Sequence, residues 1–448
     1  MRNEDRIIYH IYPLGALGVL EAKATLREPA PLARIDDWIP VMERIGANTL
    51  LLGPVSMSAT HGYDVLDLDR VDPRLGDAQD LSELSKRLRE RGIELVLDAV
   101  LNHVGRGHPL VQEVAADPTS PRADWIAGFD PRSKKGGLPF GYRDWNGHEE
   151  LVKLDTGNHQ VRRWLIESVL GWIDAFGIRG IRVDAADCLD RQFLELLAHR
   201  CHERDEEFLL LGEALPGETC ATLLEAGLDS ATNYEGYKSL WSSHNDANYH
   251  ELSWTLERLF GATGLCRGHL LQTFADNHDV DRVASRLVDQ NHLYPLHGLL
   301  FSMPGIPSIY AGSEYGIHGR RTNADDRSLR PALDPRLLAG MAPHPDLPAA
   351  IARFAEARRT CAALRRGTYR TLRVESRRFA FLRQSPGQAV VVAVNASGNR
   401  EALPVHLEEC SGRILRDLLD PDYRLPIPQT GNATIDIPPN WIRFLATD

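Results

Sequence analysis

The sequence has few cysteines and no long apolar run. Its 448 residues include six cysteines, which are scattered and form no Cys-x-x-Cys pair. This spacing predicts reduced, mostly buried thiols and no structural zinc site. Residues 1–6 are charged and lead directly into a short apolar segment, so no export signal or membrane-spanning stretch is expected there. We therefore predict a cytoplasmic protein with no membrane partner.

An excess of positive charge is also lacking. The chain has 51 Lys and Arg against 62 Asp and Glu, a net charge of −11. Nucleic acids are polyanions and would be repelled by most faces of such a protein, so we expect no nucleic-acid partner. An uncharged small-molecule substrate fits this balance better.

Short apolar runs alternate with helical stretches up to about residue 365, which is typical of repeated β-α units. Eight such runs predict eight strands and favour a closed (β/α)8 TIM barrel over an open doubly wound sheet. We expect this barrel to comprise residues 1–102 and 156–367. The predicted strands are Ile7–Pro13, Thr49–Leu52, Glu94–Val100, Gly180–Val183, Phe208–Gly212, Ser230–Thr232, Leu270–Phe274 and Ile306–Tyr310.

Two further regions depart from this alternation. Residues 103–155 follow the third strand and are rich in Gly, Pro, Asp and aromatic residues, as expected of an inserted subdomain that shapes a substrate cleft. Residues 368–448 show period-two segments separated by turns, which predicts an antiparallel β-sandwich domain. Three aromatic residues are either sugar-stacking platforms or plain packing: Tyr142, Trp145 and Tyr234.

Three acidic residues, Asp184, Glu213 and Asp279, each come one or more positions after a short apolar run. Carboxyl ends of barrel strands meet at one face, so we expect these three side chains to converge. Converging carboxyl groups are suited to acid, base and nucleophile chemistry on a glycosidic bond.

The neighbours of these acids suggest different protonation states. Arg182 and Asp184 are two residues apart and project to the same side of their strand, so the guanidinium is expected to lower the pKa of Asp184 and keep it ionised. A plain structural ion pair is the alternative. Glu213 follows four apolar residues, and desolvation should raise its pKa as a general acid requires.

Polar residues at the third and seventh strands complete the expected site. Asp98 and His103 lie at the end of the third strand, where Asp98 is either a site residue or a structural partner of Arg182. His278 and Asp279 follow the seventh strand and could hold two hydroxyl groups of one sugar ring.

The assembled segments resemble, in order, the short conserved regions of the α-amylase superfamily of glycoside hydrolases. Segments that follow the second and eighth predicted strands resemble further regions of that family. The resemblance covers the whole chain and is carried by Asp98–His103, Gly180–Asp184, Glu213, Asn277–Asp279, His61–Asp64, Val71–Gly76 and Gly305–Glu314.

The resemblance implies a retaining mechanism in which Asp184 is the nucleophile, Glu213 the general acid/base and Asp279 the carboxylate that stabilises the transition state. The first two carboxyl groups should lie about 5–5.5 Å apart. It also implies that the reacting sugar is bound by Tyr63, which stacks on its ring, together with Arg182, His103, His278 and the nearby Asp98.

Family members often bind calcium through an asparagine that matches Asn102. The insert offers no convincing set of partner carboxylates, so we expect no metal and no cofactor, with calcium as the less favoured alternative.

Within the superfamily, the segments Tyr9–Gly15 and Ala185–Asp190 look most like the cyclomaltodextrinase, neopullulanase and maltogenic amylase group. That group usually carries an extra amino-terminal domain, whereas here the first strand is expected at Ile7, and its aromatic residue after the catalytic Glu is replaced by 214–216, Ala-Leu-Pro. We expect small malto-oligosaccharides as substrates, linear or cyclic, with α-1,4 or α-1,6 bonds, including cyclic maltosyl-maltose. A homodimer is conceivable by analogy.

Two other functions stay open on sequence grounds. A transglycosylase or isomerase of the same superfamily would keep the three acids and differ in how well water is excluded from the covalent intermediate. A non-catalytic amylase-like binding protein is disfavoured because all three acids are present. An unrelated barrel enzyme for phosphorylated metabolites is disfavoured because the loops after the last two strands lack a Gly-rich phosphate cradle.

Overall fold

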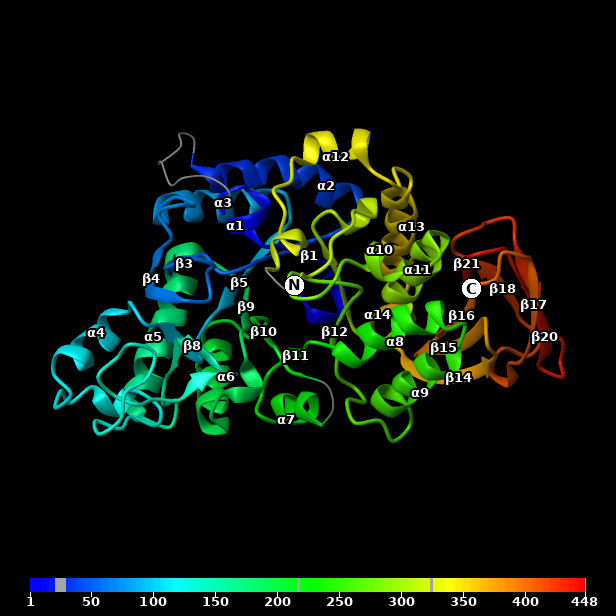
Figure 1. The fold of residues 1–448 in the computed structure, drawn as a ribbon. Helices are drawn as coiled ribbons and strands as arrows, with labels where there is room; N and C mark the ends of the chain where they lie inside the picture. Colours follow the sequence, from blue (N-terminus) through cyan, green and yellow to red (C-terminus); the bar gives the residue numbers. More distant parts are fainter. Residues whose placement is uncertain (21–29, 216–217, 323–324, 448) are drawn as a thin grey trace.

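Eight parallel strands form one barrel sheet in a computed structural model that describes residues 1–20, 30–215, 218–322 and 325–447 (Figure 1). Their order is β11-β10-β9-β5-β2-β1-β13-β12, and a parallel bridge between Thr232 and Gln272 joins the two ends. The predicted closed barrel is confirmed. Its strands are β1 (Ile8–Ile11), β2 (Thr49–Leu52), β5 (Glu94–Ala99), β9 (Gly180–Val183), β10 (Leu209–Gly212), β11 (Ser230–Ala231), β12 (Gln272–Phe274) and β13 (Ile306–Tyr310).

The strands match the predicted ones, and several are one to three residues shorter. The first strand ends at Ile11 because Pro13, which has no N–H for a sheet ladder, begins the short helix α1. The seventh begins at Gln272 rather than at Leu270. Apolar runs therefore located the strands, and the ladder hydrogen bonds decided their ends.

Helices pack around the barrel and bury their apolar stripes against it. On α3 the stripe of Leu81, Leu84 and Leu88 is fully buried, and Asp77 and Asp80 form a capping box at its start. The helices are α1 (Pro13–Ala16), α2 (Ile39–Arg44), α3 (Ala78–Glu90), α5 (His159–Phe176), α6 (Arg191–Arg204), α7 (Thr219–Glu225), α8 (Tyr234–Asn245), α9 (Tyr249–Phe260), α10 (Val283–Arg286), α11 (Leu293–Ser302), α12 (Pro335–Met341), α13 (Leu347–Thr360) and α14 (Ala362–Arg366).

The inside of the barrel changes from apolar to polar along the strands. A small buried cluster, separate from the main core, fills the amino-terminal part: Ile8, Leu51, Val96, Leu209, Leu211 and Ile306. Side chains of one strand alternate between its two sides, so the next inward positions toward the carboxyl ends are His10, Asp98, Arg182 and Glu213. The alternation alone therefore brings these polar groups together at the mouth of the barrel.

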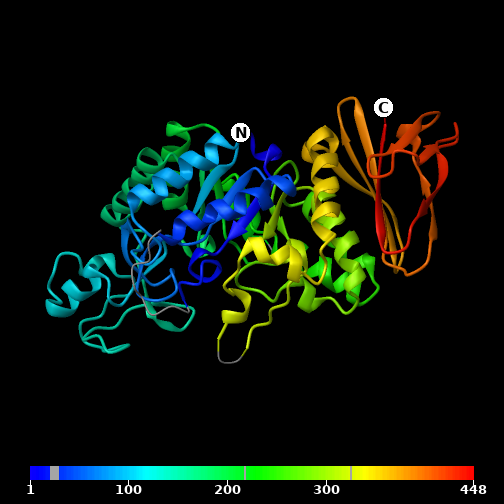
Figure 2. The same cartoon turned by 90° about the horizontal axis from the view of Figure 1, so that it is seen from above.

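The insert and the C-terminal region lie at opposite ends of the molecule (Figure 2). The insert contains α4 (Pro109–Ala116) and an antiparallel sheet of β6 (His103–Gly105), β8 (His148–Lys153) and β7 (Asp144–Trp145). Beside it, β3 (Ser56–Ser58) pairs with β4 (Val65–Val71). The predicted domain limits at 102/103, 155/156 and 367/368 stay predictions.

The C-terminal strands are antiparallel, as the period-two segments predicted. Six form one sheet in the order β14-β15-β16-β21-β18-β19, and β17 pairs with β20. Within the described residues, no helix combines the length and apolar content needed to cross a membrane. The strands are β14 (Thr368–Val374), β15 (Arg378–Ser385), β16 (Gln388–Asn395), β17 (Glu401–His406), β18 (Ile414–Asp417), β19 (Arg424–Pro426), β20 (Asn432–Ile437) and β21 (Trp441–Thr447).

Candidate active site

Three carboxyl groups converge on one guanidinium at the mouth of the barrel. Nη1 of Arg182 lies 2.7 Å from both carboxylate oxygens of Asp98 and 3.3 Å from Oδ1 of Asp184. Its Nη2 lies 2.7 Å from Oε1 of Glu213. These side chains come from the carboxyl ends of β5, β9 and β10, and all are largely buried. The structure thus brings together two of the three acids expected to converge, Asp184 and Glu213, and the third acid on this guanidinium is Asp98.

The pairing of Arg182 differs from the sequence-based expectation. Its shortest contacts go to Asp98 and Glu213, so the expected Asp98–Arg182 partnership is present while Asp184 has the longest contact. Burial and the neighbouring Glu213 charge raise the pKa of Asp184 well above its ordinary value, and Arg182 only partly opposes this. The expected lowering of this pKa is wrong for the free site, because one cation is shared by three buried acids.

Glu213 has the environment expected of a proton donor. Burial raises the pKa of its carboxyl group, although Arg182 opposes that shift. Its Oε2 accepts a 3.0 Å hydrogen bond from the backbone N–H of Ala185, a residue with φ of +45° just after β9. The left-handed turn at Ala185 thus aims an N–H at the carboxyl group.

The segment 214–216 stands where the resembling group has an aromatic residue. In it, Ala214 is buried and Leu215 is exposed, while Pro216 lies outside the described residues.

Asp279 is held by two cationic or polar groups from different segments. Its Oδ1 accepts a 2.8 Å bond from Nη2 of Arg330, and its Oδ2 lies 3.0 Å from Nε2 of His278. Arg330 also donates from Nε to the His278 carbonyl oxygen at 3.0 Å. Sequence reasoning missed Arg330, which follows a short 3-10 helix well beyond β13 and has no strand pattern around it.

Aromatic rings surround His278. The rings of Tyr12 and Tyr63 are both nearly parallel to it, each with a centroid distance of 5.6 Å, and His10 meets it edge-on at 5.1 Å. Tyr63 donates to Asp98 at 3.0 Å and its hydroxyl also contacts Nε2 of His278. Burial lowers the pKa of His278 well below its ordinary value, so the ring is neutral at pH 7.

Tyr12 and His10 were not named as site residues in the sequence, although both belong to the segment Tyr9–Gly15 that carries part of the resemblance. His10 could have been found from the sequence, because side chains alternate along a strand and His10 therefore points to the same side as the inward Ile8. The ring of Tyr63 is partly exposed, and its stacking on a sugar stays a prediction.

His103 begins the insert as the first residue of β6 and is buried. Burial lowers its pKa to about 4, so it too is neutral at pH 7. Trp145 from β7 packs near it with a ring-centroid distance of 5.7 Å.

Of the other aromatic candidates, Tyr142 is buried and donates to the Glu149 carbonyl, as in plain packing. The Tyr234 hydroxyl accepts a bond from Asn277 at 3.1 Å, next to the site.

The implied calcium ligand, Asn102, is fully buried and its side-chain oxygen has no hydrogen-bond partner. Its amide nitrogen lies 3.2 Å from Nδ1 of His103. Across the parts of the chain that the structure describes, no group of three or more His, Cys, Asp or Glu is arranged to hold a metal ion. The expected absence of a metal stays a prediction.

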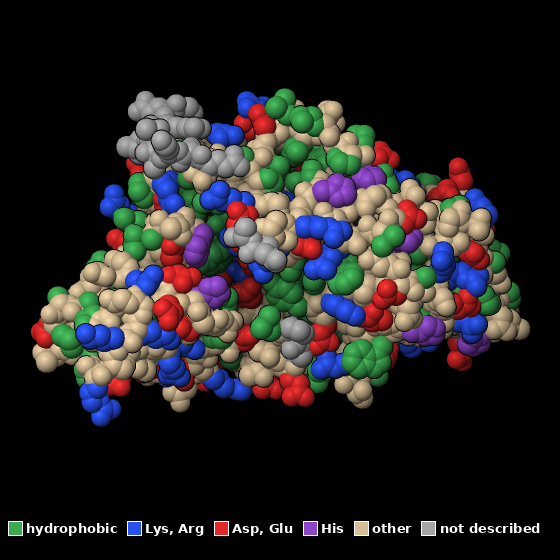
Figure 3. Space-filling model, in the orientation of Figure 1, with side chains coloured by type: hydrophobic (Ala, Val, Ile, Leu, Met, Phe, Trp, Pro, Cys, Tyr) green, Lys and Arg blue, Asp and Glu red, His purple; other side chains and the backbone are tan. Residues whose placement is uncertain are grey.

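The space-filling view shows a hollow over the barrel, with histidine and acidic side chains gathered around it (Figure 3). This surface agrees with the convergence of acids and histidines described above. A neutral ligand with many hydroxyl groups would find carboxylates, imidazoles and a tyrosine as partners there.

Comparison with known proteins agrees with this geometry. A family model described as "Alpha amylase, catalytic domain" matches residues 31–339. Alpha-amylase MalA of Haloarcula japonica is 28% identical over 324 residues, which are 71% of this chain and 45% of that protein. A cyclomaltodextrinase of Bacillus sp is 27% identical over 372 residues, 81% of this chain and 65% of that protein. The chain therefore spans about half to two thirds of the length of these curated relatives.

Among solved structures, the ligand-free cyclic α-maltosyl-(1→6)-maltose hydrolase of Arthrobacter globiformis superposes with a TM-score of 0.80 at 24% identity, and the match covers 99% of both chains. At that identity the likeness concerns the fold. Because the catalytic-domain model matches well over half of the residues, this chain belongs to the alpha-amylase family of glycoside hydrolases.

Proposed function

We propose that this protein is a retaining α-glycoside hydrolase that cleaves α-1,4 bonds, and secondarily α-1,6 bonds, in small malto-oligosaccharides, cyclic ones included. The observation that carries the proposal is the set of Asp184 and Glu213 on one guanidinium, with Asp279 held beside them by Arg330 and His278. Relatives and structural neighbours named for cyclomaltodextrins and for cyclic maltosyl-maltose support the substrate class.

In the proposed first step, a carboxylate oxygen of Asp184 attacks the anomeric carbon while Glu213 gives its proton to the leaving glycosidic oxygen. In the second step, Glu213 removes a proton from water, which displaces Asp184 from the anomeric carbon. Two inversions at that carbon retain its α configuration. Asp279 would bind sugar hydroxyls and stabilise the positive charge that develops on the ring.

Asp184 and Glu213 share the guanidinium of Arg182, and this arrangement bears on which of the two carboxyl groups carries a proton. Burial raises the pKa of both Asp184 and Glu213, so the pair favours holding one proton between them. A glycosidic oxygen bound beside Glu213 would accept its hydrogen bond and draw the proton to that residue. Arg182 would then stabilise the carboxylate of Asp184.

A product panel tests this proposal: maltotriose, panose, cyclodextrins, pullulan, trehalose and cyclic maltosyl-maltose, with the first-formed anomer followed by NMR. We expect new reducing ends that appear first as the α anomer. Longer or rearranged sugars without a net gain of reducing ends would instead favour a transglycosylase or isomerase. Absence of products from every sugar, with binding retained, would favour an amylase-like binding protein.

The proposal requires no cofactor or metal, because acid, base and nucleophile are all protein carboxyl groups. A small-molecule oligosaccharide is the proposed partner, with no nucleic acid and no membrane. The cytoplasmic location and the homodimer stay predictions.

A further inference from the structure

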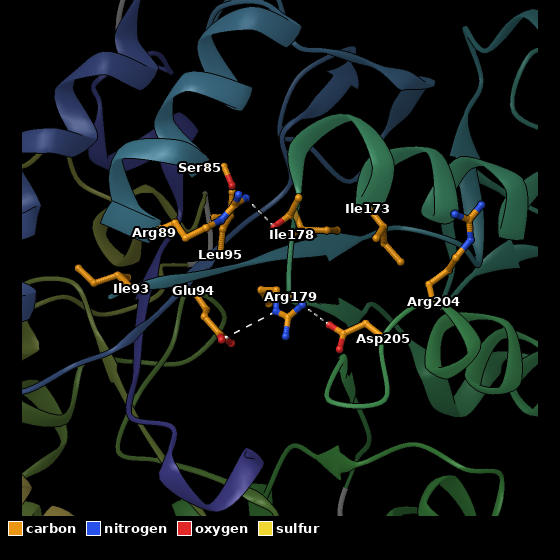
Figure 4. Close-up of a pocket in the computed structure, with 11 residues that line it drawn as sticks. Ser85, Arg89, Ile93, Glu94, Leu95, Ile173, Ile178, Arg179, Arg204 and Asp205 are labelled. Carbon is orange, nitrogen blue, oxygen red and sulfur yellow. Dashed lines mark hydrogen bonds and ion pairs between the residues drawn. The ribbon is translucent and has the colours of Figure 1, made fainter. Parts of the chain in front are cut away.

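Two cavities open near the amino-terminal ends of the barrel strands, and they differ in how their arginines are neutralised. The first has a volume of about 500 Å³ and is lined by Arg89, Arg179 and Arg204, with Glu94 and Asp205 (Figure 4). Arg179 lies 2.6 Å from Asp205, and Arg204 lies 3.1 Å from Asp174. Arg89 donates to the backbone carbonyl of Gly177. Arg179 is thus paired within the cavity and Arg204 with an acid outside its lining, and two lining acids, Glu94 and Asp205, face three arginines.

The second cavity, of about 390 Å³, lies in the seam between the barrel and the C-terminal sheet; we call it the seam cavity. It is bordered by the loop before β12, Pro304 two positions before β13, the junction of α14 with β14, and β15. Its charged lining comprises Arg267, His269, Arg366, Arg370, Arg383 and Glu4. Among the described residues that line it, Glu4 is the only acid.

The arginines of the seam cavity are only partly neutralised. Arg366 lies 3.2 Å from Glu4, and Arg370 pairs with Glu409, which is outside the cavity lining. Arg267 donates to the carbonyl oxygen of Ala262 and has an exposed side chain. In a chain with a net charge of −11, this concentration of positive charge around one concavity is unusual.

Arg383 of the cavity lining and Arg358 are both fully buried and have no carboxylate partner among the described residues. Arg383 donates to the carbonyl oxygens of Ser302 and Gly367 at 2.6 and 2.9 Å, and Arg358 donates to those of Leu364 and Gly305. Within the described residues neither forms an ion pair. Burial, together with the positive charge of Arg358, lowers the pKa of Arg383 to about 9, which reflects the uncompensated charge. A buried charge is normally paired, so an anion nearby would stabilise this seam.

We propose that the seam cavity binds a phosphate-bearing small molecule, with its phosphate held by Arg267, Arg366 and Arg370 and with the buried cation Arg383 behind them. Guanidinium groups match phosphate oxygens in geometry as well as in charge. The volume exceeds what a phosphate group alone needs, so the ligand class is a small organic phosphate ester, with inorganic phosphate as the simpler source of the same chemistry.

The position of the cavity separates it from the sugar site. Its lining includes Leu270 and Pro304, which precede β12 and β13, and Glu4, which precedes β1. The carboxyl groups of the active site lie at the opposite ends of the barrel strands. A ligand in the seam cavity therefore does not compete with substrate, and its binding is independent of Asp184.

The experiment titrates the full chain with inorganic phosphate or with glycerol 3-phosphate by isothermal titration calorimetry, at constant ionic strength set with chloride. We expect saturable binding at one site and a rise in Tm with ligand, because a ligand that binds only the folded protein stabilises it. The double variant Arg366→Gln/Arg370→Gln should bind at least about ten-fold more weakly.

Matched controls make the result specific. Arg132→Gln/Arg163→Gln removes two exposed arginines outside the cavity and should leave the affinity unchanged, as should Asp184→Asn. Tighter binding of glycerol 3-phosphate identifies an ester as the ligand class, and equal affinity of the two probes identifies free phosphate; both outcomes support the site. No saturable binding of either probe up to about 10 mM, or equal affinity of the Arg366/Arg370 variant and the parent, would overturn it.

Discussion

At the carboxyl ends of the barrel strands, three buried acids share the single guanidinium of Arg182, whereas in the seam below the strands Arg358 and Arg383 are buried without any acid among the described residues. The first region has more acidic groups than cations. The second has buried cations and, in the described part of the chain, no acidic partners for them. Both imbalances are adjacent to a concave surface open to ligands. Under the two proposals, each imbalance is matched by a ligand of opposite charge: a sugar ring that becomes positive in its transition state at the mouth, and a phosphate group at the seam.

The largest effect should come from removing the acids at the mouth. Asp184→Asn or Glu213→Gln should each lower kcat on maltotriose by at least about 10³-fold, because each removes a group that the proposed chemistry needs. The exposed acid Glu167, changed to Gln, is the matched control and should leave kcat unchanged. Near-normal turnover in either active-site variant would contradict the assigned roles.

Replacing a buried arginine of the seam should change the free energy of unfolding rather than the rate of catalysis. Arg358→Met should lower the free energy of unfolding by about 3 kcal/mol, because the carbonyl oxygens of Phe301, Leu364 and Gly305 lose their donor. Denaturant unfolding measures this change. The exposed neighbour Arg359, changed to Met, should cost under about 0.5 kcal/mol; similar losses for both variants would show that the buried bonds contribute little.

Replacing Arg182 with lysine should change how strongly the acids at the barrel mouth are compensated. Arg182→Lys keeps one charge but cannot contact Asp98, Asp184 and Glu213 together, so kcat/KM should fall about 100-fold. Arg182 lowers the pKa of all three acids, so the acid limb of the pH–rate profile should move to higher pH. An unchanged acid limb with reduced activity would mean that Arg182 only positions the strand ends.

Asp184 should destabilise the folded protein at neutral pH. An acid whose folded pKa is raised holds more protons in the folded than in the unfolded chain, so stability declines as pH rises from about 4 through the folded pKa. Asp184→Asn removes this loss and should raise Tm by about 2 °C at pH 7, with the gain shrinking toward pH 4. The exposed Asp174, changed to Asn, serves as control; a gain for Asp184→Asn that does not vary with pH would refute this linkage.

The smallest expected effect concerns the turn that aims an N–H at Glu213. Ala185 has a left-handed backbone with φ of +45°, so Ala185→Gly should relieve strain and stabilise the protein by about 0.5 kcal/mol with activity retained. The adjacent Ala186→Gly lacks that relief and should destabilise by a similar amount. Thermal unfolding of both variants compares the two directly, and equal signs would show that the turn is unstrained.

Much of the site followed from local pattern. Asp98 and Glu213 follow the buried apolar residues Val96 and Leu211 by two positions, and the strand β9 puts Arg182 opposite Asp98, so the strand assignment placed all three at inward positions. Arg330 could not be assigned in this way, because its contact with Asp279 depends on a loop that is distant in the sequence. Tyr12 follows His10 by two residues, but it lies just beyond β1, where the strand pattern has ended. The unpaired arginines of the seam were likewise hidden, because their partners are backbone carbonyls that carry no sequence signal.

Period-two and period-3.6 patterns in the amino-acid sequence were enough to predict the barrel, its antiparallel C-terminal sheet and the meeting of Asp184 with Glu213 at the strand ends, since these depend on alternation along single elements. The protonation of the active-site carboxyl groups was decided only by the tertiary structure. Whether Arg182 lowers the pKa of Asp184 depends on how many acids share it and how deeply they are buried, and three acids gathered from three strands reverse what the two-residue spacing of Arg182 and Asp184 predicted.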